Sequence, residues 1–142
     1  EYTEAPVETE ENSTDKEAKN IISGTWTGKM GDKDLTIVIE TVYKNELTGY
    51  NKLGSNKRTL NGTFEGGFWE QPCSRAFEAI LEEPGDDKWD GVFTIKFVGY
   101  KDEKETDNGL ECFGEYKGVE AMGEWKSNNG KLERSFTLTR EK

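Results

Sequence analysis

The sequence predicts an all-β protein, an antiparallel up-and-down meander β-barrel of eight or nine strands. Three observations predict it: short segments alternate apolar and polar residues, turn sequences separate them, and a glycine precedes an aromatic residue by two positions at five places within the expected strands. Residues two apart in a strand share a face, so each step places an empty position beside a large ring, as a strongly curved sheet requires. The steps are Gly24-Thr25-Trp26, Gly62-Thr63-Phe64, Gly91-Val92-Phe93, Gly114-Glu115-Tyr116 and Gly123-Glu124-Trp125.

The composition limits the classes of function that this protein can have. The chain has 142 residues and a formal net charge of -10; hydrophobic residues make up 32% and aromatic residues 11%, so a few large rings must form the core. The absence of histidine excludes Ser-His and Cys-His nucleophile pairs and histidine-ligated zinc. We expect no catalytic residue, no cofactor and no metal site. The acidity also argues against nucleic acid as a partner.

The first 20 residues differ from the rest. They carry seven acidic residues against two lysines, which leaves a net charge of -5 on this segment and -5 on residues 21–142. Such a segment buries too little apolar surface to offset its ordering entropy. We therefore expect residues 1–20 to be a disordered acidic linker and residues 21–142 to form a single β-barrel domain.

The sequence does not begin with methionine, so we expect a processed or trimmed N-terminus. An acidic spacer before a compact domain resembles the segment after the lipidated cysteine of a bacterial lipoprotein, or after a cleaved secretory signal. This favours an extracytoplasmic protein that is periplasmic, secreted or a cell-surface lipoprotein. In the last case a lipidated N-terminus that this chain lacks would tether it to a membrane.

The strands follow one another with short connections. We expect them near residues 23–30, 35–43, 46–52, 57–65, 75–83, 89–100, 110–116, 119–126 and 131–140. Asn108-Gly109 and Asn129-Gly130 favour tight hairpins, and Lys117-Gly118 separates the seventh strand from the eighth. These connections cannot hold crossover helices, so neighbouring strands are antiparallel, and closing the sheet removes unpaired edges.

Several of these residues resemble a known superfamily. Gly24-Thr25-Trp26 opening the first strand, the meander of hairpins and an arginine late in the last strand are similar to the calycins, which include lipocalins, fatty-acid-binding proteins and avidins. In lipocalins this tryptophan packs at the closed end with an arginine stacked across it. The resemblance matches Trp26 to the tryptophan and Arg134 or Arg140 to the arginine.

Avidins supply a narrower likeness. Leu47-Thr48-Gly49-Tyr50 and Trp89-Asp90-Gly91-Val92-Phe93 are similar to the ends of avidin strands. Where avidins place polar residues that grip the biotin ureido group, however, this chain has Gly28, Met30 and Asp32. The resemblance therefore implies the barrel but not biotin binding.

The aromatic rings are candidates to line a ligand cavity. A barrel of eight strands is near the size at which the interior is either filled by side chains or holds one small molecule. Both alternatives stay open here: the rings line a cavity, or they fill the core. The candidates are Trp26, Phe64, Trp89, Phe93, Tyr116 and Trp125.

Arg134 is a candidate inward charge because it shares its register with Leu132, Phe136 and Leu138. An inward arginine suits a ligand carboxylate, since its planar fork matches that group. The alternative is a fixed partner inside the protein, either the ring of Trp26 or an internal glutamate.

Cys73 and Cys112 are the two cysteines of the chain. In an oxidising compartment a disulfide between them would close a loop of about 40 residues and add about 4 kcal/mol of stability. Two reduced, half-buried cysteines are the alternative.

The function predicted from these features is that of a non-enzymatic extracytoplasmic barrel that binds a small apolar or amphipathic molecule inside. The alternative is a surface interaction or inhibitor module with a solid core and no internal ligand.

Overall fold

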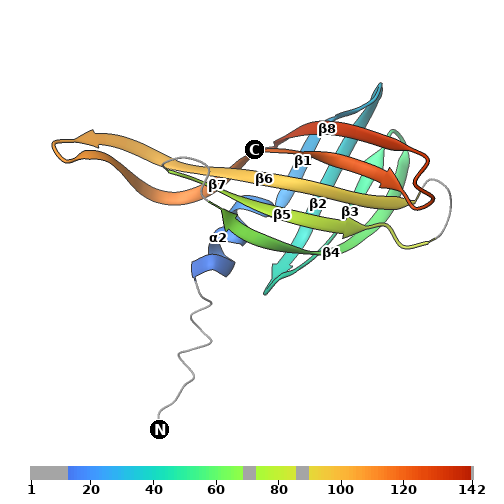
Figure 1. The fold of residues 1–142 in the computed structure, drawn as a ribbon, viewed down its shortest axis with the longest axis horizontal. Helices are drawn as coiled ribbons and strands as arrows, with labels where there is room; N and C mark the ends of the chain where they lie inside the picture. Colours follow the sequence, from blue (N-terminus) through green and yellow to red (C-terminus); the bar gives the residue numbers. More distant parts are fainter. Residues whose placement is uncertain (1–12, 69–72, 86–89, 142) are drawn as a thin grey trace, which may run out of the picture.

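The chain forms a closed barrel of eight antiparallel strands, as the sequence predicts (Figure 1). The computed structural model describes residues 13–68, 73–85 and 90–141. Consecutive strands pair in chain order, and β1 pairs with β8 to close the sheet. A helix, α2 (Ser13–Ile22), precedes β1. The strands are β1 (Gly24–Met30), β2 (Lys33–Tyr43), β3 (Glu46–Leu53), β4 (Asn56–Phe68), β5 (Ser74–Glu82), β6 (Gly91–Thr106), β7 (Gly109–Ser127) and β8 (Glu133–Arg140).

The inward face of the barrel follows the predicted alternation. In β2, Leu35, Ile37 and Ile39 are buried, and the threonine and valine between them are only half-buried. In β8, Phe136 and Leu138 are buried between exposed neighbours. One apolar face therefore encloses the core and one polar face meets water.

The helix α2 corrects the expectation that residues 1–20 are a disordered linker. Residues 13–20 belong to this helix, and residues 1–12 lie outside the described part. Ala18, Ile21 and Ile22 are each 0% exposed, and their spacing of three and four residues places them on one helical face. The folded domain therefore begins before residue 21. A single alanine among charged residues gave too weak a pattern to predict this turn of helix.

α2 packs against the barrel at two glycines that lie opposite each other in the β6–β7 ladder. Gly99 of β6 and Gly118 of β7 face each other in the ladder, and a Cβ atom at Gly118 would overlap the carbonyl oxygen of Ile21. The prediction that Lys117-Gly118 is a turn between two strands is therefore wrong, because β7 continues through it with a register shift nearby. Gly118 instead allows the helix to lie close to the strand, because glycine has no side chain.

The outer parts of β6 and β7 form a hairpin that extends beyond the barrel (Figure 1, orange). Its ladder runs from Asp102 opposite Phe113 to Thr106 opposite Gly109. Cys112 on this hairpin is bonded to Cys73, just before β5, with the two Cα atoms 5.3 Å apart. The disulfide therefore ties the hairpin to the barrel wall.

The half of the barrel next to α2 is filled with side chains. Trp26 donates its indole N–H to the carbonyl oxygen of Ile22 at 2.9 Å, and its ring meets Phe97 edge-on with centroids 5.1 Å apart. Phe64 and Phe77 pack in the same way at 5.8 Å. This half corresponds to the solid core that the sequence left as one alternative.

No helix in the described ranges is both long enough and apolar enough to cross a membrane.

Candidate functional site

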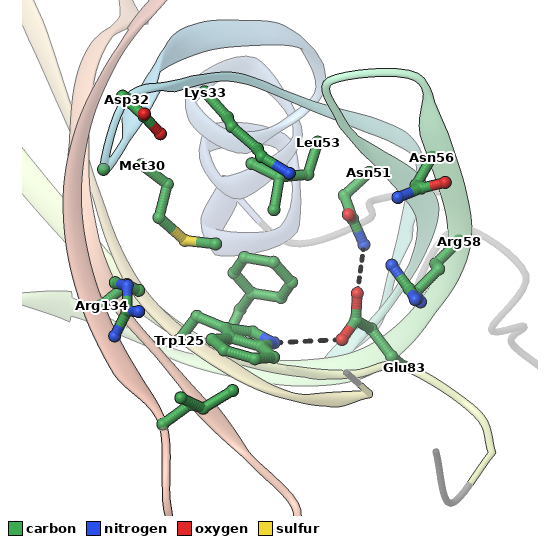
Figure 2. A pocket seen from close by; sticks show the side chains of 13 residues that line it. Met30, Asp32, Lys33, Asn51, Leu53, Asn56, Arg58, Glu83, Trp125 and Arg134 are labelled. Carbon is green, nitrogen blue, oxygen red and sulfur yellow. Dashed lines mark hydrogen bonds between the residues drawn. The ribbon is translucent and has the colours of Figure 1, made fainter. Parts of the chain in front are cut away.

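A pocket opens into the barrel at the end away from α2 (Figure 2). Its volume is about 320 Å³, which lies at the small end of the range for ligand sites. Gly31 in the β1–β2 turn and Asn56, the first residue of β4, form part of its mouth. α2 instead contacts the end of the barrel where β1 begins, and the view of Figure 2 looks past the pocket towards it.

Apolar side chains from separate strands form one part of the pocket wall. Met30 ends β1, Leu53 ends β3, and Phe93 and Trp125 lie opposite each other in the ladder of β6 and β7. Leu132 adds a half-buried side chain just before β8. These groups give an apolar or aromatic body a surface to bury against.

A buried polar cluster forms another part of the wall. Glu83, which follows β5, is 5% exposed, and its Oε1 atom accepts hydrogen bonds from the backbone N–H of Gly91 at 2.8 Å and from Trp125 Nε1 at 3.0 Å. Its Oε2 atom accepts from Asn51 Nδ2 at 2.9 Å, and Asn51 itself is 1% exposed. Three donors from three strands therefore fix one carboxylate beside the pocket.

Arg58 borders the same cluster. Its Nε atom lies 3.0 Å from Oδ1 of Asp90, and the two side chains are 26% and 10% exposed. Arg58 and Asn51 face each other in the ladder of β3 and β4, which places the guanidinium next to the amide on the wall. Figure 2 shows Asn51, Arg58 and Glu83 together on one side of the opening, across from Met30.

Charged residues of both signs surround the mouth. Asp32, Lys33 and Arg134 line it, and neither Lys33 nor Arg134 forms an ion pair with any described residue. Arg134 is exposed, and its Nη1 atom donates to the carbonyl oxygen of Glu133 at 2.8 Å. Arg134 therefore lies at the rim, where solvent reaches it, and not inside the core.

The predicted site residues divide between the two ends of the barrel. Phe93, Trp125 and Arg134 meet at the pocket. Trp26 and Phe64 lie in the filled half, and Tyr116 lies at the base of the extended hairpin, under the ammonium group of Lys101 at 4.7 Å. Trp89 falls outside the described residues.

Tyr116 has an unusual environment for its hydroxyl group. The side chain is 3% exposed, and burial raises the pKa of the phenol above its ordinary value of 10.0, while the nearby Arg75 guanidinium lowers that pKa by a smaller amount. Arg75 in turn pairs with Glu17 of α2. Tyr116 and Arg75 therefore join the helix, β5 and β7 rather than line a cavity.

The arginine at the closed end is Arg140. It faces Trp26 in the ladder of β1 and β8, and its Nη1 atom donates to the carbonyl oxygen of Asn20 at 3.3 Å. Arg134 faces Trp125 near the opposite end. The barrel is consistent with a calycin-like fold, and Arg140 is the residue that takes the position expected beside the first tryptophan.

Asn51, Arg58 and Glu83 are site residues that sequence reasoning did not find. Asn51 and Arg58 lie on β3 and β4, where the alternation of apolar and polar residues is weak. Glu83 directly follows Glu82 in the chain, and only the folded structure shows that Glu83 is buried while Glu82 is exposed. The sequence did offer one signal for this site: Asn51 lies within an expected strand, where asparagine is uncommon.

The described residues contain no group of three or more histidine, cysteine, aspartate or glutamate side chains arranged to hold a metal ion. The Cys73–Cys112 disulfide is typical of an oxidising, extracytoplasmic environment.

The chain matches no protein-family model, and comparisons with curated proteins and with solved structures found no similar protein.

Proposed function

We propose that the protein is a non-enzymatic binding protein that takes one small, partly apolar molecule into the open end of its barrel. The pocket carries this proposal: it combines an apolar wall of Met30, Phe93 and Trp125 with a buried polar cluster, and it is open to solvent. Concave, largely preformed sites with few convergent polar groups are the usual form of small-molecule sites. The filled half behind the pocket limits the depth that a ligand can reach.

The extracytoplasmic location belongs to the same proposal. A disulfide that holds the hairpin to the barrel suits a periplasmic, secreted or surface-tethered protein. In such a compartment a small barrel with a preformed pocket would capture or carry a diffusible compound.

A titration with small probe molecules tests the proposal. Indole, octanoate and benzamide fit the size and partly apolar character of the pocket, and nuclear magnetic resonance would follow the Met30 methyl group and the Trp125 indole N–H. We expect at least one probe to shift both signals with a dissociation constant of about 1 mM or lower. If no probe shifts either signal at 10-fold higher concentrations, about 10 mM, the proposal is wrong.

A blocking variant and a matched control locate the binding. Leu132→Trp places a bulky ring at the half-buried pocket wall, where it fills part of the pocket. We expect it to weaken binding of the same probe by about tenfold or more. Leu110→Trp, on the exposed hairpin, is the control and should leave the affinity unchanged. Equal binding by both variants would place the probe elsewhere.

A second candidate function is a surface interaction through the hairpin of β6 and β7. Leu110 is 46% exposed and Phe113 is 49% exposed on a segment that extends away from the barrel (Figure 1). Large apolar side chains held in solvent by a disulfide-anchored hairpin favour contact with another macromolecule. Loss of a partner on Phe113→Ser substitution, with probe binding unchanged, would support this second function.

A further inference from the structure

The amide of Asn51 is buried beside the pocket with unused hydrogen-bonding capacity. Its nitrogen donates to Glu83, and because an ionised carboxylate can only accept, this bond fixes which side of the amide carries the oxygen. None of the described residues donates to Oδ1 of Asn51, although the side chain is 1% exposed. Figure 2 shows the Asn51 side chain on the pocket wall with its nitrogen facing Glu83. Buried polar atoms in folded proteins nearly always have a partner, so Oδ1 requires a donor from within the pocket.

Glu83 offers a second acceptor next to the first. Its Oε1 atom already accepts two hydrogen bonds, whereas Oε2 accepts one, from Asn51. A carboxylate oxygen can accept two, so Oε2 retains one acceptor position. Among the described residues no lysine or arginine lies within ion-pair distance of this carboxylate. Asn51 Oδ1 and Glu83 Oε2 therefore form a pair of neighbouring acceptors on the pocket wall.

Arg58 supplies hydrogen-bond donors next to this pair of acceptors. Its Nε atom is occupied by Asp90, and no described residue accepts from its two terminal nitrogens. The guanidinium lies on the same side of the pocket as Asn51 and Glu83 (Figure 2). The guanidinium can therefore donate to an acceptor atom of a ligand when a donor group of the same ligand meets Asn51 and Glu83.

The charges around the pocket favour a neutral ligand. Lys33, Arg58 and Arg134 contribute three positive charges, and Asp32, Glu83 and the Arg58 partner Asp90 contribute three negative charges. The balance leaves neither a carboxylate nor an ammonium group with a net electrostatic advantage. Hydrogen-bond geometry therefore decides which head group fits.

We propose that the ligand is a neutral molecule with an apolar, ring-sized body and an NH2 group beside a carbonyl or ring-nitrogen acceptor. Primary aryl carboxamides and amino-substituted aromatic heterocycles have this form. The two N–H bonds meet Asn51 Oδ1 and Glu83 Oε2, the acceptor meets Arg58, and the body lies against Met30, Phe93 and Trp125. This inference rests on the proposed function and adds the chemical class of the ligand to it.

A matched pair of probes separates this inference from the proposed function. Benzamide and methyl benzoate share the phenyl ring and the carbonyl oxygen, but only benzamide has an NH2 group. Both can accept from Arg58, and they differ only where a methoxy group replaces the NH2 group that would meet the two acceptors. We expect benzamide to bind the full-length protein at least about tenfold more tightly by calorimetry or by resonance titration.

The outcomes are distinct. Tighter binding of benzamide supports the inference. Equal binding, or tighter binding of methyl benzoate, overturns the inference and leaves the proposed function standing. Binding of neither compound, together with no binding of indole or octanoate, overturns the proposed function itself.

Two variants test the residues. In Asn51→Leu the preference for benzamide should fall to within about twofold, because one acceptor is lost. Glu83→Gln keeps the shape of the side chain and should also reduce the preference, because an amide group offers one acceptor oxygen where the carboxylate offers two. An unchanged preference in both variants would overturn the assignment. If either variant does not fold, the comparison of the two probes on the unaltered chain still decides.

Discussion

The indole N–H of Trp125 donates to the Oε1 atom of Glu83 across 3.0 Å, which joins the end of β7 to the residue after β5. Both side chains are 5% exposed and both line the pocket. The hydrogen bond therefore links the stability of this end of the barrel to the shape of its binding site.

Trp125→Phe should destabilise the protein by about 1–3 kcal/mol, because it leaves Oε1 of the buried Glu83 with a single donor. Urea unfolding monitored by circular dichroism would measure the change. A double-mutant cycle with Glu83→Gln provides the control, and we expect a coupling energy of about 0.5 kcal/mol or more. Additive effects would show that the hydrogen bond contributes nothing to stability.

Ile21→Ala should lower the free energy of unfolding by about 2–5 kcal/mol, since it creates a cavity where α2 packs on Gly99 and Gly118. Lys19→Ala, on the exposed face of the same helix, is the matched control and should change stability by about 0.5 kcal/mol or less. Similar stabilities of the two variants would mean that α2 is not part of the folded core.

Reduction of the Cys73–Cys112 disulfide should cost about 4 kcal/mol of stability, because the bond joins residues 39 positions apart and so closes a long loop in the unfolded chain. Chemical unfolding with and without a reductant measures this cost. The pocket lies at the other end of the barrel, so probe binding should persist in the reduced protein under native conditions. Rapid alkylation of two thiols in the untreated native protein would contradict the disulfide.

The stability of the protein should decline at alkaline pH through Tyr116. Burial raises the pKa of this phenol in the folded state above the ordinary value of 10.0 that we assign to the unfolded chain. The folded state therefore binds the proton more tightly, and its stabilising effect is complete below pH 10.0 and is lost as the pH rises through the folded-state pKa.

Tyr116→Phe should make this alkaline decline shallower, as measured by melting temperature between about pH 8 and pH 12. Tyr43→Phe changes a tyrosine that is 70% exposed and serves as the control, with no effect expected on the slope. Equal slopes for the two variants would exclude Tyr116 as the titrating group.

The fold could be predicted from the sequence because its signals are local. Alternation in β2, β6 and β8 and the Asn108-Gly109 hairpin identify strands and connections without reference to distant residues. The prediction of a turn at Lys117-Gly118 was wrong because a glycine that allows Ile21 to approach closely cannot be told from a turn glycine in the sequence. The helix was missed because its apolar face contains so few residues.

The site was predictable only in part. Phe93 and Trp125 were found because large rings at inward positions are visible in the sequence. Which rings fill the core and which line a pocket depends on the position of α2, whose packing closes one end of the barrel. The contacts of Glu83 with Asn51, Gly91 and Trp125 join residues between 8 and 42 positions apart, so no local pattern indicates them.

The most direct test of the central claim, a small-molecule site at the open end of the barrel, is a set of intermolecular nuclear Overhauser effects between bound benzamide and the protein. We predict contacts from the phenyl protons to the Met30 methyl group and the Trp125 ring. Contacts only to exposed side chains such as Leu110, Phe113 or Ile80, or no contacts at saturating benzamide, would contradict the account.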